Sequence, residues 1–282
     1  MNQPKISVIL PNYNYAKYLP IRLKEILAQT YRISEIIILD DASTDNSIAV
    51  IKKELHALKT THPEIKTKTI FNKKNSGSVF SQWQKGIAAA TCDYIWIAEL
   101  DDSCSSDFLA IATAPIIEDR RVILSYTGSK LIGDISLKDR LRSTILDRLR
   151  RRHLHCNYVV DGKVELKKNL AVFNSIPNVS ACVFKKIPDL IEILDEAKTY
   201  RLSGDWLFYA RLATLGKIAF SSKRANYHRL SQETVTGQIS LEKRYQEVLD
   251  IHSRISEFTD LSMSTQARMS HLERRLKTNW HL

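Results

Sequence analysis

The sequence predicts an α/β protein built on a parallel, doubly wound sheet. Short apolar runs alternate with segments whose leucine and isoleucine residues recur at helical spacing through roughly the first 100 residues. Each apolar run also ends in polar or acidic residues. This alternation is typical of βαβ units, and ligands of such sheets bind beyond the carboxyl ends of the strands. We therefore expect a ligand site at that edge of the sheet.

The predicted elements follow one another through short connections. Strands are expected at residues 6–10, 36–39, 69–71 and 94–98. Helices are expected between them, at residues 19–29, at residues 48–55 and in a segment ending at residue 90. The fourth strand is apolar throughout, which is typical of a strand buried on both faces.

Polar pairs stand where the four strands end. They are Asn12-Tyr13, Asp40-Asp41, Asn75-Ser76 and Asp101-Asp102. The sequence contains neither GxGxxG nor GxxxxGK[ST], the glycine-rich patterns whose backbone N–H groups bind phosphates. We therefore expect any bound phosphate to be neutralised by a metal ion.

Three carboxylates, Glu99, Asp101 and Asp102, follow the fourth strand. Carboxylates this close repel one another, so a divalent cation with oxygen ligands is one explanation. The other is a solvated acidic turn in which Asp102 caps the helix that continues through residues 108–109. These residues alone do not decide between a metal site and a helix cap.

The composition indicates a soluble globular protein with an anionic partner. The 282-residue chain carries 42 Lys and Arg against 31 Asp and Glu, a net charge of +11. This charge suits a nucleotide, a phospholipid surface or nucleic acid. The four cysteines form no CxxC pair, which argues against a zinc site or a disulfide framework and suits a reducing cytosol. No apolar run approaches the ~18 residues of a membrane span and no signal-peptide pattern opens the chain, so a cytoplasmic protein is expected.

Four segments resemble the motifs of family 2 glycosyltransferases, which have the GT-A fold. In chain order they are PNYNYAKYL, QTYRISEIIILDDASTDNS, NSGSVFSQWQKGI and DYIWIAELDD. The resemblance implies a mixed, mostly parallel sheet flanked by helices. It also implies that Asp102 ligates Mn²⁺ or Mg²⁺ bridging the donor phosphates and that Asp101 meets the ribose or the metal shell. It therefore favours the metal interpretation over the helix cap.

The resemblance also implies which residues bind the donor. Asp41 corresponds to the aspartate that accepts the N3–H of uracil, and cytosine has no hydrogen there, so UDP or dTDP donors are favoured over CDP donors. Pro11 and Tyr13 would line the base and stack on it. Ser76 and Lys85 would bind the nucleotide sugar, with Lys85 near the diphosphate. The alternatives are a partly buried loop aromatic for Tyr13 and a plain surface lysine for Lys85.

The acceptor and the catalytic base are expected in the second half. Residues 202–208 place Asp205 at the head of an apolar helix, a common position for a helix cap. The resemblance instead makes Asp205 the catalytic base and Trp206 an acceptor contact. Asn178 and Ser180 resemble the family's acceptor-cleft segment, or they only satisfy a turn backbone. One base and a metal-stabilised leaving group suffice for a single in-line displacement, which inverts the anomeric configuration.

Residues 225–236 resemble the family's flexible loop and follow a strand predicted at residues 216–220. His228 and Arg229 would close over the diphosphate, and a structural role in the loop is the alternative. The chain departs from the family pattern at the next two positions, so no ligand role carries over to them.

We divide the chain into a glycosyltransferase domain at residues 1–238 and a C-terminal helical extension at residues 239–282. In the first, residues 1–104 form the nucleotide-sugar half and residues 105–238 the acceptor half, with a basic helical insertion at about 134–156. The insertion repeats apolar residues every fourth position among many arginines, so it either lies on anionic lipid or packs on the protein. Peripheral contact with the inner membrane is one expectation.

The function predicted is that of a metal-dependent hexosyl- or N-acetylhexosaminyltransferase using a UDP- or dTDP-sugar. The resemblance indicates a glycan or lipid-linked acceptor and a role in bacterial surface polysaccharide, O-antigen or capsule synthesis. One alternative, a sugar-phosphate nucleotidyltransferase, would carry a glycine-rich loop after the first strand. The other, a basic nucleic-acid or membrane-binding module, rests only on the charge. We expect no nucleic-acid partner, because no recognition-helix or RNP pattern occurs.

Overall fold

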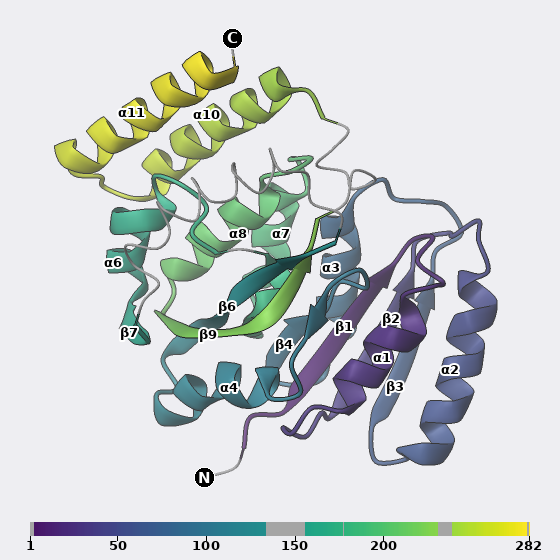
Figure 1. Ribbon diagram of the computed structural model, residues 1–282. Coiled ribbons are helices and arrows are strands. Elements are labelled where there is room, and N and C mark those ends of the chain that lie inside the picture. Colours follow the sequence, from purple (N-terminus) through teal and green to yellow (C-terminus); the bar gives the residue numbers. More distant parts are fainter. Residues whose placement is uncertain (1–2, 134–155, 177, 231–238, 281) are drawn as a thin grey trace.

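The structure is a computed structural model that describes residues 3–133, 156–176, 178–230, 239–280 and 282 (Figure 1). Almost all of the predicted basic insertion and most of the second half of the predicted loop lie outside the described residues. A twisted sheet runs through the molecule with helices on both faces, and a pair of helices sits at one end (Figure 1).

The described strands form one mixed sheet in the order β3-β2-β1-β4-β8-β6-β9-β5, with β7 paired to β9. Their bounds are β1 (Ile6–Asn12), β2 (Glu35–Asp40), β3 (Lys66–Phe71), β4 (Tyr94–Ile97), β5 (Ser103–Cys104), β6 (Val122–Ile132), β7 (Tyr158–Asp161), β8 (Cys182–Lys185) and β9 (Lys217–Arg229). The ladders β1–β2, β2–β3 and β1–β4 are parallel, as is the long β6–β9 ladder. The strand β8 is antiparallel to both of its neighbours, β4 and β6. The predicted mixed, mostly parallel sheet is confirmed.

Helices cover the two faces of the sheet. They are α1 (Leu19–Leu27), α2 (Ser47–Thr61), α3 (Val79–Ala89), α4 (Phe108–Glu118), α6 (Gly162–Glu165), α7 (Leu190–Ala197), α8 (Gly204–Ala213), α10 (Leu241–Phe258) and α11 (Met263–Trp280), with a short π-helix at Leu166–Leu170 and a 3-10 turn at Val179–Ala181. Alternate residues of β1 enter two different cores. Ile9 packs with α3, α7 and α8, whereas Val8 and Leu10 pack with α1, α2 and α4. Burial on both faces explains why the inner strands read as continuous apolar runs.

Two elements differ from the sequence prediction. β9 continues through Arg229 as one strand, because it pairs with β6 as far as Ile132, so residues 225–229 are not loop as expected. The short strand β5 separates Asp102 from α4 and pairs with β9. The alternative in which Asp102 starts that helix is therefore wrong.

Gly204 begins α8 in a place where a side chain has no room. A Cβ there would lie 2.3 Å from the carbonyl oxygen of Ala197 and 2.8 Å from the ring of Phe80. Gly204→Ala is expected to lower the free energy of unfolding by about 1–3 kcal/mol, because the start of the helix must shift. Chemical denaturation measures this, and an unchanged midpoint with an unchanged m-value would show that the helix adjusts freely.

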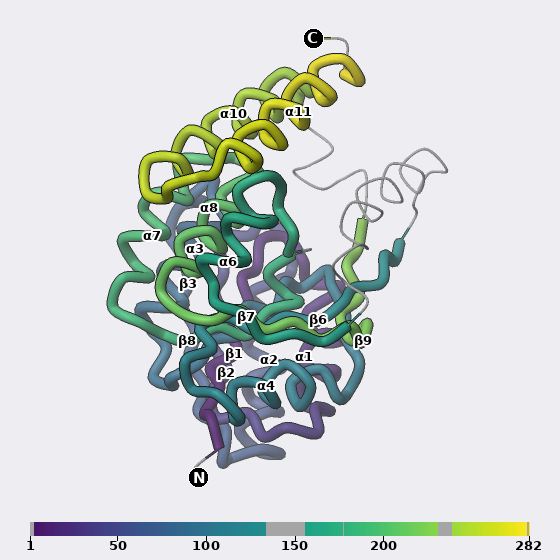
Figure 2. The backbone as a smooth tube through the Cα atoms, turned by 90° about the vertical axis from the view of Figure 1, so that its left-hand side faces the viewer, coloured from purple at the N-terminus to yellow at the C-terminus, as the bar shows by residue number. Residues whose placement is uncertain are grey.

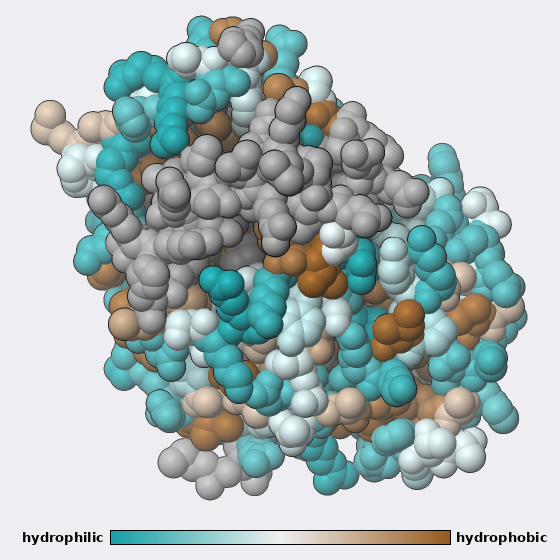
Figure 3. Space-filling model, viewed as in Figure 1, coloured by the Kyte–Doolittle hydropathy of each residue, from teal (hydrophilic) through white to brown (hydrophobic). Residues whose placement is uncertain are grey.

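The C-terminal helices α10 and α11 lie side by side, and α10 packs on α8 (Figures 1 and 2). The two helices match the helical extension expected from residue 239 onward. On the face shown in Figure 3, the coloured hydrophobic residues occur in small groups among hydrophilic ones. Among the helices that the structure describes, none has both the length and the apolar composition of a membrane span.

Candidate active site

The ends of β1 and β2 are joined by polar side chains that shape the site. Asn12 donates from Nδ2 to Oδ1 of Asp40 at 2.7 Å and to Oγ of Ser43 at 3.1 Å. Asn14 adopts a positive φ of 59°, and its Oδ1 accepts the backbone N–H of Thr44 at 2.7 Å. The loop after β1 and the loop after β2 are thereby tied together, which fixes the residues between them.

Asp41 is the centre of a hydrogen-bond network directly after β2. Its Oδ1 accepts from Nδ2 of Asn72 at 2.5 Å, from the backbone N–H of Ser76 at 2.9 Å and from Nε2 of Gln82 at 2.9 Å. Its Oδ2 accepts from Oγ of Ser76 at 2.7 Å. Asp41 is 5% exposed. The structure thus brings together Asp41 and Ser76, as the resemblance predicts, and adds two amides that it did not single out.

The other predicted donor-binding residues surround this network. Pro11 is buried within β1, whereas Tyr13 is 46% exposed. This exposure leaves the ring of Tyr13 available for stacking, and it is equally compatible with a partly buried loop aromatic. Lys85 is exposed on α3 and donates from Nζ to Oδ1 of Asn72 at 2.7 Å. Lys85 is therefore linked to Asp41 through the amide of Asn72.

Asp102 does not cap α4. The residue before that helix is Asp107, whose own side chain makes no capping hydrogen bond, and Oε1 of Gln29 accepts the backbone N–H of Leu109 at 2.9 Å. Instead, Oδ2 of Asp102 accepts from Nδ2 of Asn178 at 2.5 Å and Oδ1 accepts the backbone N–H of Arg229 at 2.9 Å. Asn226 in turn donates to Oδ1 of Asn178 at 2.9 Å. β9 and the turn before β8 therefore hold Asp102 in place.

The acidic cluster is electrostatically strained. Burial, followed by the charge of Asp101, raises the pKa of Glu99 to about 8. Burial, followed by the charge of Asp102, raises the pKa of Asp101 to about 6. Tyr15 donates from its hydroxyl to Oδ2 of Asp101 at 3.4 Å, and Trp83 donates from Nε1 to Glu99 at 2.8 Å. A cation placed here would relieve the repulsion between these carboxylates.

The carboxylate oxygens of this cluster fit a divalent cation that is also coordinated by a bound ligand. A carboxylate offers about four acceptor positions, and Asp102 uses two of them for protein donors. Within the described ranges, no group of three or more His, Cys, Asp or Glu side chains is arranged to hold an ion by itself. The coordination shell of Mg²⁺ usually consists of one or two carboxylates together with phosphate oxygens and water.

His228 and Arg229 lie on β9 beside the acidic cluster. Both are partly buried, and Nε of Arg229 donates to the backbone oxygen of Asp101 at 2.7 Å. The guanidinium of Arg229 also lies 5.5 Å from the ring centroid of Tyr18. The two residues are near the predicted metal-binding carboxylates, but on a strand rather than on a loop that closes.

Asp205 lies in the first turn of α8 and is partly exposed. Its Oδ1 accepts the backbone N–H of Trp206 at 2.7 Å, and its Oδ2 accepts from Nδ2 of Asn174 at 3.3 Å. Asp205 and Glu99 both contribute to raising the pKa of buried Tyr209, after the larger effect of burial. The carboxylate of α8 and the acidic cluster after β4 therefore share one neighbourhood.

Two residues that were predicted to contact the acceptor are buried instead. Ser180 is fully buried, and its Oγ accepts the backbone N–H of Glu99 at 3.1 Å. Trp206 is 4% exposed, and its indole donates to the backbone oxygen of Leu170 at 2.6 Å. Neither side chain is placed to contact an acceptor, whereas Asn178 is partly exposed beside Asp102. The Ser180 hydroxyl instead binds the backbone that follows β4, which is neither an acceptor contact nor the backbone of its own turn.

A match to a family model identifies the family of this chain. The model described as Glycosyl transferase family 2 matches residues 7–160, which is more than half of the chain. The chain belongs to this family of glycosyltransferases. The matched residues include Asp41 and the acidic cluster, and the resemblance read from the four segments is confirmed.

Relatives of this glycosyltransferase match it over different lengths. An uncharacterized glycosyltransferase of Nostoc sp. is 43% identical over 99 residues, covering 35% of this chain and 28% of that protein. A cholesterol galactosyltransferase of Borreliella burgdorferi is 23% identical over 269 residues, covering 89% of this chain and 72% of that protein. The matches span less than half the length of the first curated relatives.

Solved structures share the fold of this glycosyltransferase. S. aureus TarS in complex with UDP-GlcNAc superposes with a TM-score of 0.68 at 17% identity, covering 97% of this chain and 73% of that chain. Mannosyltransferase PcManGT from Pyrobaculum calidifontis, in complex with GDP-Man and Mn²⁺, gives 0.63 at 18% identity, covering 98% and 70%. At these identities the likeness shows the fold alone.

Several residues of the glycosyltransferase site were not singled out from the sequence. Asn72, Gln82, Asn174 and Tyr15 each bond directly to Asp41, Asp205 or Asp101. Gln82 lies six residues after Ser76 in one of the four segments that resemble the family. Its position on the inner face of α3 could have identified it from the sequence. Asn174 has no such signal, because it meets Asp205 only through the fold.

Proposed function

We propose that this glycosyltransferase transfers a sugar from a UDP- or dTDP-sugar to an acceptor hydroxyl with inversion of the anomeric carbon. The observation that carries the proposal is that carboxylates of two kinds lie near buried Tyr209. An acidic cluster at the strand ends suits a metal and a diphosphate, and the partly exposed Asp205 lies on a different element, α8. This division of roles is what a single displacement requires.

Donor recognition centres on Asp41. Four protein donors already bond its two oxygens, which is about the capacity of a carboxylate, so the uracil or thymine N3–H would replace one of them, such as the hydroxyl of Ser76. Tyr13 provides an exposed ring for the base. The chain Lys85–Asn72–Asp41 places a cation beside the same ligand.

Asp102 and Asp101 would hold Mn²⁺ or Mg²⁺. When bound, the ion neutralises the charge that develops on the leaving diphosphate. The protein's own contribution is to orient Asp102 through Asn178 and the backbone of Arg229. These two bonds hold the carboxylate that would bind the ion in one orientation.

Asp205 acts as the general base. Its Oδ2 takes the proton of the acceptor hydroxyl as the hydroxyl oxygen attacks the anomeric carbon, and the bond to the nucleoside diphosphate breaks on the opposite side. Nδ2 of Asn174 donates to that same oxygen and holds its orientation. No general acid is needed, because the leaving diphosphate is already a stable anion.

We place the reaction in the assembly of bacterial surface polysaccharide, on a glycan or lipid-linked acceptor at the inner membrane. This rests on the family resemblance alone. No feature of the described residues favours a nucleotidyltransferase or a nucleic-acid-binding module.

The testing experiment measures UDP release from UDP-glucose, UDP-galactose and UDP-N-acetylglucosamine with and without Mn²⁺, alongside thermal shifts with UDP, dTDP, GDP and CDP. We expect Mn²⁺-dependent stabilisation by UDP or dTDP and Mn²⁺-dependent turnover of at least one donor. Stabilisation by CDP or GDP alone would contradict the donor assignment, and the lack of any nucleotide effect would contradict the proposal.

Asp41→Asn is expected to weaken UDP binding by about 5–150-fold, since an unmatched buried polar group costs about 1–3 kcal/mol. The new NH₂ would face the N–H donors that Asp41 now accepts. Isothermal titration with UDP and Mn²⁺ measures the loss. The matched control is Asp93→Asn, an exposed aspartate just before β4 at the opposite edge of the sheet. Equal affinity of both variants for UDP would remove Asp41 from the donor site.

A further inference from the structure

We propose that Glu247, on the C-terminal helix α10, is a positioning residue for the catalytic base Asp205. The inference rests on the proposed function, because Asp205 matters in this way only as the base. Glu247 does not touch substrate in this proposal. It acts through the backbone that leads into α8.

Glu247 bonds the turn immediately before α8. Its Oε1 accepts the backbone N–H of Arg201 at 2.8 Å, and its Oε2 accepts those of Leu202 at 3.0 Å and Ser203 at 2.8 Å. Glu247 is 8% exposed. Three consecutive N–H groups therefore point at one buried carboxylate, and the next residues are Gly204 and the predicted base.

The energetics favour a fixed turn. Burying a carboxylate is costly unless hydrogen bonds compensate, and charge-assisted bonds to N–H groups are about twice as strong as neutral ones. Ser203, the residue before α8, makes no side-chain cap of its own. A carboxylate more than 40 residues later in the chain thus supplies the anchor that the start of α8 lacks. Gly204, which has no room for a Cβ, keeps the turn in contact with Ala197 and Phe80.

The same helix holds the partner of Asp205. Nε2 of His252 on α10 lies 3.0 Å from the backbone oxygen of Val172, two residues before Asn174. The ring of His252 also packs edge-on against Trp206, with 5.5 Å between the ring centroids. α10 therefore holds both segments that meet at Oδ2 of Asp205.

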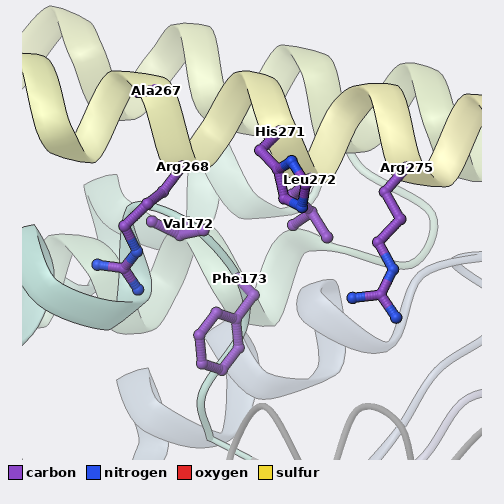
Figure 4. A pocket seen from close by; sticks show the side chains of 7 residues that line it. All are labelled: Val172, Phe173, Ala267, Arg268, His271, Leu272 and Arg275. Atoms are coloured by element: carbon purple, nitrogen blue, oxygen red, sulfur yellow. The ribbon is translucent and has the colours of Figure 1, made fainter.

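The second of these segments also lies under α11. Figure 4 shows Val172 and Phe173 beneath α11, with Arg268, His271 and Arg275 along the helix. A partly open pocket of about 300 Å³ lies between part of the segment and the helix, while Val172 and Met269 of α11 belong to one buried hydrophobic cluster. The hydrogen bond from His252 on α10 therefore adds to side-chain packing in fixing this segment.

Glu247→Gln tests the proposal. Glutamine keeps the length but replaces one acceptor oxygen with an NH₂, which opposes at least one of the three N–H groups, so the turn shifts. We expect kcat for UDP release from the best donor to fall about 10–100-fold, since a displacement of about 1 Å in a reacting group costs up to about 100-fold. KM for the donor and the thermal shift with UDP and Mn²⁺ should remain. Glu242→Gln, an exposed glutamate of the same helix, is the matched control with unchanged kinetics.

A double-mutant cycle separates positioning from general support of the fold. In the Asp205→Asn background, Glu247→Gln should lower the residual rate no further, because the group it positions is already lost. Glu247→Asp, which keeps the charge but reaches less far, should give an intermediate kcat and provides the answer if Glu247→Gln is unstable. An unchanged kcat in both Glu247 variants, or an additive loss in the cycle, would overturn the inference. An active Asp205→Asn enzyme would instead overturn the proposed function.

Discussion

Asp205→Asn should lower kcat for sugar transfer by about 10²–10⁴-fold, the usual contribution of a general base. Asparagine has nearly the same shape but cannot take the acceptor's proton. Its carbonyl oxygen can still accept from Asn174 or from the N–H of Trp206, the two donors that bond Asp205. The local structure should therefore survive while the chemistry is lost.

The measurement is steady-state UDP release from the donor that the wild type turns over, together with titration of UDP and Mn²⁺. KM for the donor and the affinity for UDP should stay within about twofold of wild type. The substitution leaves unchanged the interactions that bind the donor equally in the ground state and the transition state. Asp195→Asn is the matched control, since that aspartate is exposed on α7 and pairs with Lys198. Loss of UDP binding in Asp205→Asn would mean a structural carboxylate, and full activity would exclude it as the base.

The N-terminal half of the fold could be predicted because its signals are local. β1, β2 and β4 are buried on both faces, so each reads as an uninterrupted apolar run. β3 was expected to be shorter than it is, since its outer lysines and threonines hide the strand pattern. The polar strand ends then had to meet at one edge, which is why Asp41 and Ser76 could be placed together from sequence.

The second half depends on contacts between distant residues, and sequence patterns are weaker there. Whether Ser180 and Trp206 face a ligand or the core depends on the neighbours that cover them, and those neighbours come from other elements. The strand β9 was expected to end early, because its own residues do not reveal that it pairs with β6. The link from Glu247 to the turn before α8 joins residues more than 40 apart and has no local signature.

The orientation of Asp102 shows how both halves build one site. Its position comes from the N-terminal half, just beyond β4, but its hydrogen-bond donors are Asn178 before β8 and Arg229 at the end of β9. Asp102 is therefore oriented by the half of the chain in which we predict the acceptor site.

Asp102→Asn should weaken the Mn²⁺-dependent part of UDP binding and lower kcat by at least about 10–100-fold, the loss typical of even the outer partners of a metal site. Removing the negative charge takes away a ligand, and the new NH₂ opposes the donors from Asn178 or Arg229. Titration of UDP at a series of Mn²⁺ concentrations measures the effect. Asp93→Asn, at the opposite end of β4, should bind as the wild type does.

The dependence on ion concentration separates a ligand from a structural support. If Asp102 binds the ion, excess Mn²⁺ should restore part of the UDP affinity, because a weaker site is filled by mass action. If Asp102 only holds Asn178 and the end of β9 in place, no concentration of Mn²⁺ will restore it, and Asn178→Ala should reproduce the whole loss. Asn178→Ala removes one donor to Asp102 and leaves the carboxylate and its bond to Arg229 intact, so a ligand role predicts a smaller loss for this variant than for Asp102→Asn.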